Sequence, residues 1–217
     1  LVETDDESHL RELLEQLPCC VSSREGVQGE PLNIVLIGQL RDLIPAFLRR
    51  NYRDAPAEPR YLFQHPQDVS VSKRGLWVAA QPHLLRAWLT TIRFRGRPVW
   101  VCQVSTPLGG RFARATEDGA APPIDPDVDE ARNDLVQDVM YSQSLAKIGF
   151  VKGVGRVMAL REQETPSGVT YHTDGLRAVL FIEQRPVALS EIEFLGWERL
   201  VDHYRRQPGS GESKINP

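Results

Sequence analysis

The sequence predicts an α+β fold, in which a single mixed or antiparallel sheet carries a hairpin and several packed helices. A nearly continuous apolar run at residues 32–37 is rich in β-branched side chains, which is typical of a buried central strand. Two alternating segments, 84–94 and 99–104, flank the turn 95–98 and predict the hairpin. Segments with apolar residues at helical spacing lie between the predicted strands, so helices are expected to cover the sheet.

The N-terminal third begins with a predicted helix at residues 9–17, which Pro18 ends. Residues 22–30 are polar and contain glycines, so they are expected to form a linker. After the central strand, residues 39–52 place their apolar side chains on one helical face. Pro45 lies within this segment and is expected to bend the helix or delay its start.

The middle of the chain is less regular. Residues 61–71 alternate weakly and are expected to form a short strand or an irregular segment. Residues 106–124 are rich in glycine, alanine and proline, which predicts a long surface loop with a short strand at 110–113.

The C-terminal third is predicted to start with the longest helix, residues 128–148, capped by Asp127 and ended by Gly149. Two strands are expected next, at 150–162 and 175–183, and then a final helix at 191–204 that Ser190 caps.

The domain organisation predicted from these elements has three parts. Residues 1–30 form an N-terminal helix and linker, residues 31–204 form the main domain, and residues 205–217 form a disordered tail. No run of about 18 apolar residues occurs, so no membrane-spanning segment is expected among the 217 residues.

Composition excludes some classes of function. With 41% hydrophobic residues the chain can form a packed core, and its net charge of -3 provides no broad basic surface for nucleic acid. Of the three cysteines, Cys19 and Cys20 are adjacent and can bridge each other only with strained geometry. Cys102 lies in an apolar run, where a buried, inert thiol is expected.

The acidic residues Asp125, Asp127 and Asp129 precede the long predicted helix and form the candidate metal site. Alternating carboxylates could bind a divalent cation such as Mg²⁺ or Ca²⁺. However, Pro126 takes the second place, and the glycine turn of a calcium loop is missing. The alternative is that these carboxylates cap the helix and form its charged first turn.

Candidate ligand-binding residues lie on the first hairpin strand. His83, Arg86 and Trp88 occupy its start, and Arg86 and Trp88 share one face. A stacked arginine and tryptophan can hold an anionic ligand, although they can equally form a surface cross-strand pair.

A second group of candidates involves Arg132, Asp174 and Arg177. Arg132 could pair with Asp129, three residues before it, or with Asp174 across the sheet. Asp174 is primarily a turn residue before Gly175, and Arg177 follows at the start of a predicted strand.

Several strings, in a fixed order, together resemble the LssY C-terminal type domain of bacteria. They are PLNIVLIG (31–38), QD (67–68), HLLRAW (83–88), GRPVW (96–100), IDPDVD (124–129) and the segments 136–138, 171–177 and 191–195. The likeness runs from about residue 31 to residue 197. Many relatives carry histidines just before the Ile-x-Pro-x-x-Asp string, where this chain has Pro122 and Pro123.

The resemblance implies a soluble domain with no assigned reaction and no cofactor. Relatives form the last part of membrane proteins, some with a PAP2-type lipid-phosphate phosphatase or a DedA-type membrane domain, and others follow a short membrane anchor. The implied localisation is therefore at a membrane, through a parent protein or an anchor. The implied partners are a membrane protein or parent membrane domain and an anionic lipid headgroup.

Three functions remain open at the level of sequence. The first is a non-catalytic domain that binds its partner through the hairpin and the loop before Asp125. The second is a metal-dependent hydrolase or phosphoesterase acting on a phosphorylated, lipid-like substrate, with Asp125, Asp127 and Asp129 on the metal and Arg86 or Arg177 on the phosphate. The third is a structural oligomerisation module. A hydrolase requires the three carboxylates to converge, whereas the binding function predicts that they cap the helix.

Overall fold

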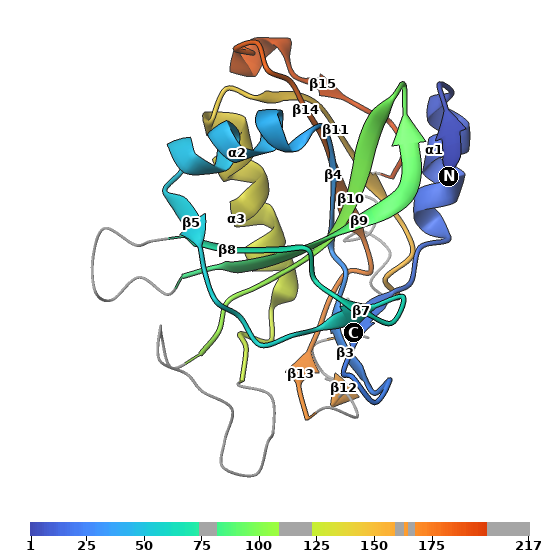
Figure 1. Cartoon of the computed structure of the whole chain (residues 1–217), viewed down its shortest axis with the longest axis vertical. Coiled ribbons are helices and arrows are strands. Elements are labelled where there is room, and N and C mark those ends of the chain that lie inside the picture. Colours follow the sequence, from blue (N-terminus) through green and yellow to red (C-terminus); the bar gives the residue numbers. More distant parts are fainter. Residues whose placement is uncertain (74–81, 109–122, 159–162, 165–167, 199–217) are drawn as a thin grey trace, which may run out of the picture.

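The computed structural model describes residues 1–73, 82–108, 123–158, 163–164 and 168–198, and it confirms the α+β fold class (Figure 1). A nine-stranded mixed sheet forms the centre. Its strands are β1 (Val2–Thr4), β4 (Ile34–Ile37), β5 (Tyr52–Asp54), β8 (Val69–Lys73), β9 (Leu84–Phe94), β10 (Arg97–Ser105), β11 (Leu145–Val151), β14 (Arg177–Ile182) and β15 (Glu193–Phe194). They lie in the order β15-β11-β14-β4-β10-β9-β8-β5, and β1 pairs with the end of β9.

Two smaller sheets and three α-helices complete the described fold. The four-stranded sheet contains β2 (Cys20–Ser22), β3 (Gln28–Pro31), β6 (Tyr61–Leu62) and β7 (His65–Pro66), and the two-stranded sheet contains β12 (Gln163–Glu164) and β13 (Thr170–Tyr171). The helices are α1 (Glu7–Glu15), α2 (Leu40–Arg49) and α3 (Val128–Tyr141), and Leu189–Glu191 form a 3-10 turn.

The predicted central strand is confirmed as β4. It pairs in parallel with β14 and antiparallel with β10, and all four of its residues are buried. Ile34 and Leu36 face one hydrophobic core, while Val35 and Ile37 face the other. The unbroken apolar run is thus explained by burial on both faces.

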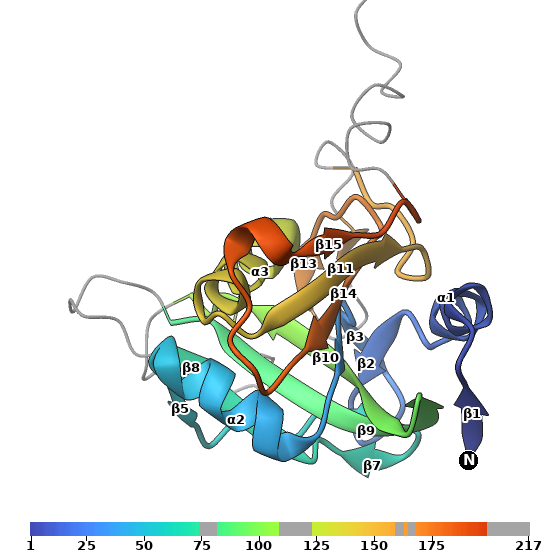
Figure 2. The ribbon, with the colours of Figure 1, turned by 90° about the horizontal axis from the view of Figure 1, so that it is seen from above.

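Each face of the sheet has its own cover, as Figure 2 shows from above. Helices α2 and α3 pack on one face through Leu43, Phe47 and Leu135. Helix α1 and the four-stranded sheet pack on the other face through Leu10, Leu14 and Val21. Residues 22–30, which the sequence analysis took for a linker, therefore supply strand residues to the second layer, and that expectation was wrong.

The predicted hairpin is confirmed as β9 and β10. Its turn places Arg95 and Gly96 at positive φ, 49° and 72°, as a type I′ turn requires at both central positions. A register shift between Pro98 and Trp100 follows the turn.

The long C-terminal helix is shorter than predicted, because α3 ends at Tyr141 instead of residue 148. The Ser142 hydroxyl donates to the carbonyl of Val139, and Gln143 turns the chain with a φ of 61°. Residues Leu145–Val151 then pair with β14, so the strand predicted at 150–162 begins earlier. Gly149, the predicted helix terminator, lies inside β11, where an added Cβ would be 2.8 Å from Trp197.

Other expectations differ in detail or fall outside the described part of the chain. Helix α2 starts at Leu40 and contains Pro45. Residues 189–194 form a 3-10 turn and strand β15 where a helix was predicted from residue 191. The predicted strand at 110–113, the end of the final helix and the tail at 205–217 lie outside the described residues. Within the described ranges, no helix is both long and apolar enough to cross a membrane.

Candidate functional site

The aspartates before and within the start of α3 bind backbone N–H groups. Asp127 is the N-cap, and its Oδ1 accepts from the amides of Asp129 and Glu130, each at 3.1 Å. Asp125 in turn accepts from the amide of Asp127 at 3.0 Å. The capping role that the sequence analysis gave as the alternative is present in the structure.

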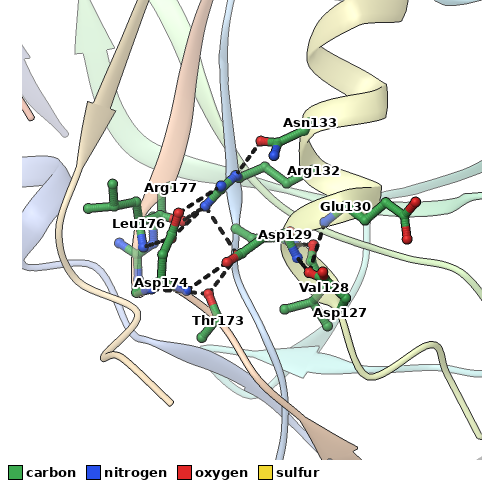
Figure 3. Close-up of polar contacts among 12 residues, drawn as sticks. Asp127, Val128, Asp129, Glu130, Arg132, Asn133, Thr173, Asp174, Leu176 and Arg177 are labelled. Carbon is green, nitrogen blue, oxygen red and sulfur yellow. Dashed lines mark hydrogen bonds and ion pairs between the residues drawn. The ribbon is translucent and has the colours of Figure 1, made fainter. Parts of the chain in front are cut away.

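Asp129 points away from Asp127, toward the loop that precedes β14 (Figure 3). Its carboxylate accepts from the Thr173 hydroxyl at 2.7 Å and from the Asp174 amide at 2.6 Å. Of the three predicted metal ligands, Asp125 and Asp127 therefore bind amides at the start of α3, while Asp129 binds the loop before β14. Across the described ranges, no group of three or more His, Cys, Asp or Glu side chains could hold a metal ion.

Arg132 is fully buried and joins α3 to the same loop. Its Nη1 and Nη2 donate to the two carboxylate oxygens of Asp174 at 2.7 and 2.9 Å, and Nη1 also donates to the Leu176 carbonyl at 3.0 Å. Asp129 completes the cluster at 3.2 Å from Nη1. The two pairings that the sequence offered as alternatives, with Asp129 and with Asp174, both form.

The Arg132 cluster contains one guanidinium and two carboxylates. Burial raises the pKa of the Asp129 carboxyl, the charge of Arg132 opposes that rise, and the charge of Asp174 adds to it. With both carboxylates ionised, this part of the interior carries a surplus negative charge, and its hydrogen bonds fix the loop before β14 against α3.

Arg177 is also fully buried, but its partners are backbone carbonyls. It donates to the carbonyls of Leu14, Leu17, Pro18, Leu32 and Gly153. Burial lowers the pKa of Arg177 to about 10, and the thiols of Cys19 and Cys20 oppose this shift. These hydrogen bonds connect the end of α1 and the segment after it to the first residue of β14.

Arg86 and Trp88 share a face of β9, as predicted, and both are buried, with exposed fractions of 4% and 0%. Arg86 donates to the side-chain oxygen of Gln103 at 2.8 Å. Burial lowers the pKa of Arg86 to about 10, which nearby Glu30 opposes. The pair lies beneath the four-stranded sheet and does not form an exposed arginine–aromatic patch.

His83 lies apart from that pair, toward α3. Its Nδ1 is 2.8 Å from the Thr106 hydroxyl, and its Nε2 is 3.1 Å from Asp134. The structure therefore divides the three predicted hairpin candidates between the two faces of the sheet.

A charged cluster that the sequence analysis missed surrounds Asp138 on α3. This carboxylate accepts from Arg50 at 3.1 Å, from Lys73 at 2.7 Å and from the Tyr52 hydroxyl at 3.0 Å. Burial and the charge of Asp138 raise the pKa of the Tyr52 phenol. These donors come from the C-cap of α2, from β5 and from β8, so no local spacing in the sequence indicates the cluster.

The outer face of α2 carries an apolar stripe of three exposed residues. Leu40, Ile44 and Leu48 follow one another at intervals of four and have exposed fractions of 43%, 51% and 47%. All three also line a groove of about 240 Å³, whose other apolar walls include Leu43, Phe47, Val69, Val71, Leu85 and Trp100. Stripe and groove form one continuous apolar surface, which we call the α2 surface.

Comparison with known proteins gives one family. Residues 45–176, more than half of the chain, match the family model described as LssY C-terminus. No curated protein and no solved structure matches the chain.

Proposed function

Because the chain belongs to the LssY C-terminal family, we propose that it is a non-catalytic accessory domain of a bacterial membrane-associated protein, and that its α2 surface binds an anionic lipid bilayer. The observation that carries this proposal is the continuous apolar stripe and groove on α2. Exposed apolar surface of this kind is typical of an interaction site. The surface takes the place of the hairpin in this proposal, since Arg86 and Trp88 are buried. Most of the loop before Asp125, the other predicted binding region, lies outside the described residues.

Arginines beside the stripe supply the charge that anionic headgroups require. The Arg41 side chain is 70% exposed, and its ion pair with Asp42 is long, at 3.9 Å. Arg49 is exposed and donates to the Ser144 hydroxyl, while Arg53, which lines the groove, donates to backbone carbonyls. A helix with an apolar stripe and flanking arginines suits the plane between headgroups and acyl chains. Each arginine near an anionic surface contributes about 1 kcal/mol.

The predicted polar site residues are committed to other contacts, which supports a binding rather than a catalytic function. Asp125 and Asp127 hold amides at the start of α3, and Asp129, Arg132 and Asp174 hold one another. The apolar α2 surface, in contrast, faces solvent in the described structure.

Vesicle sedimentation tests this function. The protein is mixed with vesicles of phosphatidylcholine alone or of phosphatidylcholine with phosphatidylglycerol, at low and at high salt. We expect binding to the anionic vesicles, weakened by salt, because the arginine contribution is screened. Ile44→Asp combined with Leu48→Asp is expected to weaken binding by at least about tenfold, since each lost apolar burial is worth roughly 1.5–3 kcal/mol.

Phe63→Asp is the matched control. Phe63 is exposed by 58% and lies between β6 and β7, in the sheet that covers the opposite face. This variant removes a large apolar side chain of similar exposure and should bind like the unaltered protein. Equal binding to neutral and anionic vesicles would contradict the role of the arginines. Absence of binding to both would overturn the lipid assignment and leave a protein segment as the occupant of the groove.

A further inference from the structure

The adjacent cysteines lie around one side-chain amide. Cys19 follows Pro18, and Cys20 begins β2. Gln28, on the neighbouring strand β3, donates through Nε2 to the Sγ of Cys20 at 3.1 Å and to the Sγ of Cys19 at 3.5 Å. Both sulfurs therefore approach the same nitrogen from a single turn of the chain. Cys20 is buried, whereas Cys19 is half-buried and open to small reagents.

The buried guanidinium of Arg177 lies against this segment. It donates to the carbonyl of Leu17 at 3.1 Å and to that of Pro18, the residue before Cys19. Among the described residues, no carboxylate forms an ion pair with Arg177. A buried cation is costly without a countercharge, and the neighbours that can become anions are the two thiols.

The two thiols are expected to differ in ionisation. A hydrogen bond from the Cys20 thiol, followed by the charge of Arg177, lowers the pKa of Cys19 to about 6 against the opposing effect of burial. The same hydrogen bond and burial raise the pKa of Cys20, and the Tyr171 hydroxyl lies 4.0 Å from its sulfur. At pH 7 the pair thus consists of a thiolate beside a protonated thiol, the arrangement of many oxidant-sensing sites.

We propose that Cys19 and Cys20 form an oxidant-reactive pair, in which the Cys19 thiolate attacks hydroperoxides and Cys20 then closes a reversible disulfide. In the first step the Cys19 sulfur forms a bond to the outer oxygen of a hydroperoxide, the O–O bond breaks, and the released alkoxide takes a proton from water. The sulfur is oxidised to a sulfenic acid, and the hydroperoxide is reduced to an alcohol.

In the second step the Cys20 sulfur attacks the Cys19 sulfur. The S–S bond forms, the S–O bond breaks, and the oxygen leaves as water with the proton of the Cys20 thiol. A bridge between adjacent residues is strained, and strain makes a disulfide easier to reduce. Reduction by an ordinary thiol therefore restores the pair.

The first test measures the alkylation rate of Cys19 against pH by peptide mapping, with Cys102 in the same sample as a fully buried reference. Cleavage after Arg11 and Arg24 places both cysteines on one peptide, residues 12–24. A thiol with a pKa of about 6 is already ionised at pH 7, so its rate should change by less than about 1.5-fold between pH 7 and pH 9. The same thiol in denatured protein, with a pKa of 9.0, should speed up by about 50-fold.

The second test adds hydrogen peroxide and measures the mass of the same peptide. The unaltered protein should lose two hydrogens and recover them with dithiothreitol. Cys20→Ser, which keeps a hydroxyl donor beside Cys19, should instead gain one oxygen that a sulfenic-acid probe traps, and Cys19→Ser should not react. A steep alkylation profile for native Cys19, or peroxide reaction no faster than that of Cys102, would overturn the proposal without recourse to any variant.

Discussion

Two fully buried arginines lie beside the start of β14, and the fold stabilises them in different ways (Figure 3). Arg132 donates to both oxygens of Asp174 and also contacts Asp129. Arg177 donates to five backbone carbonyls, and no described carboxylate pairs with it. Arg132 also donates to the carbonyl of Leu176, the residue that precedes Arg177.

The comparison shows that two equally buried arginines can have very different electrostatic surroundings. Around Arg132 two carboxylates face one cation, and the surplus charge is negative. Around Arg177 peptide dipoles solvate the cation, and no described carboxylate balances its charge. The charge of each arginine lowers the pKa of its acidic neighbour. At Asp129 burial outweighs that effect, so the pKa of the carboxyl is raised. At Cys19 the hydrogen bond from the Cys20 thiol acts in the same direction as Arg177, so the pKa of the thiol is lowered.

The largest effect on stability is expected from Arg177→Met, which removes the arginine that donates to backbone carbonyls. The variant removes the donor from four carbonyls, those of Leu17, Pro18, Leu32 and Gly153. The fifth, that of Leu14, still accepts from a backbone amide. At about 1 kcal/mol or more for each orphaned group, the free energy of unfolding should fall by about 4 kcal/mol. Urea unfolding measures this change. Arg185→Met, at a side chain that is 64% exposed, is the control and should stay within about 0.5 kcal/mol.

A smaller effect on stability is expected from Asp174→Asn, which removes the carboxylate that accepts from both terminal nitrogens of Arg132. Asp129 remains near Arg132, so the loss in unfolding free energy should be about 2–3 kcal/mol. The single variant Arg132→Met and the double variant complete a double-mutant cycle. The losses in unfolding free energy of the two single variants should add up to more than the loss in the double variant, because the double variant no longer has a buried charge with a weakened partner. Strict additivity in this double-mutant cycle would show that the ion pair is not coupled.

The smallest effect is the pH dependence of Asp129→Asn. The raised pKa of Asp129 means that the folded protein binds a proton more tightly than the unfolded chain does. The resulting stabilisation is complete below pH 3.8 and is lost as the pH rises through the raised value. The stability of the unaltered protein relative to Asp129→Asn should therefore increase from pH 7 to pH 4. A difference that is constant with pH would contradict the raised pKa.

The elements that the sequence predicts well are those fixed by short-range patterns. Strand β4 follows from a nearly continuous apolar run, and the hairpin follows from alternation around the Arg95–Gly96 turn. The boundary between α3 and β11 could not be placed, because steps of three and four residues continue a helical face through Leu135, Val139, Ser142 and Leu145. Pairing with β14, more than thirty residues later, overrides that local pattern.

The candidate site was predictable where its residues are close in sequence or lie at a turn. Asp129 is one helical turn from Arg132, and Asp174 precedes a glycine, so this cluster could be anticipated. The burial of Arg86 and Arg177 could not, since it depends on how the first thirty residues fold over the sheet. The Asp138 cluster is equally non-local, because Lys73 lies 65 residues before it.

The contacts of Arg177 also have a consequence for the order of events during synthesis. The guanidinium meets the carbonyl of Leu17 across 160 residues of chain. At about 5–20 residues per second, a ribosome needs on the order of 10–30 seconds to cover that interval. During that time β14 has not been synthesised. The nascent segment that carries Leu10 and Leu14 therefore lacks both its packing against β14 and its hydrogen bonds from Arg177. Docking of the first helix is thus expected to be a late event, and a chain stalled before residue 177 should leave this segment accessible to proteases.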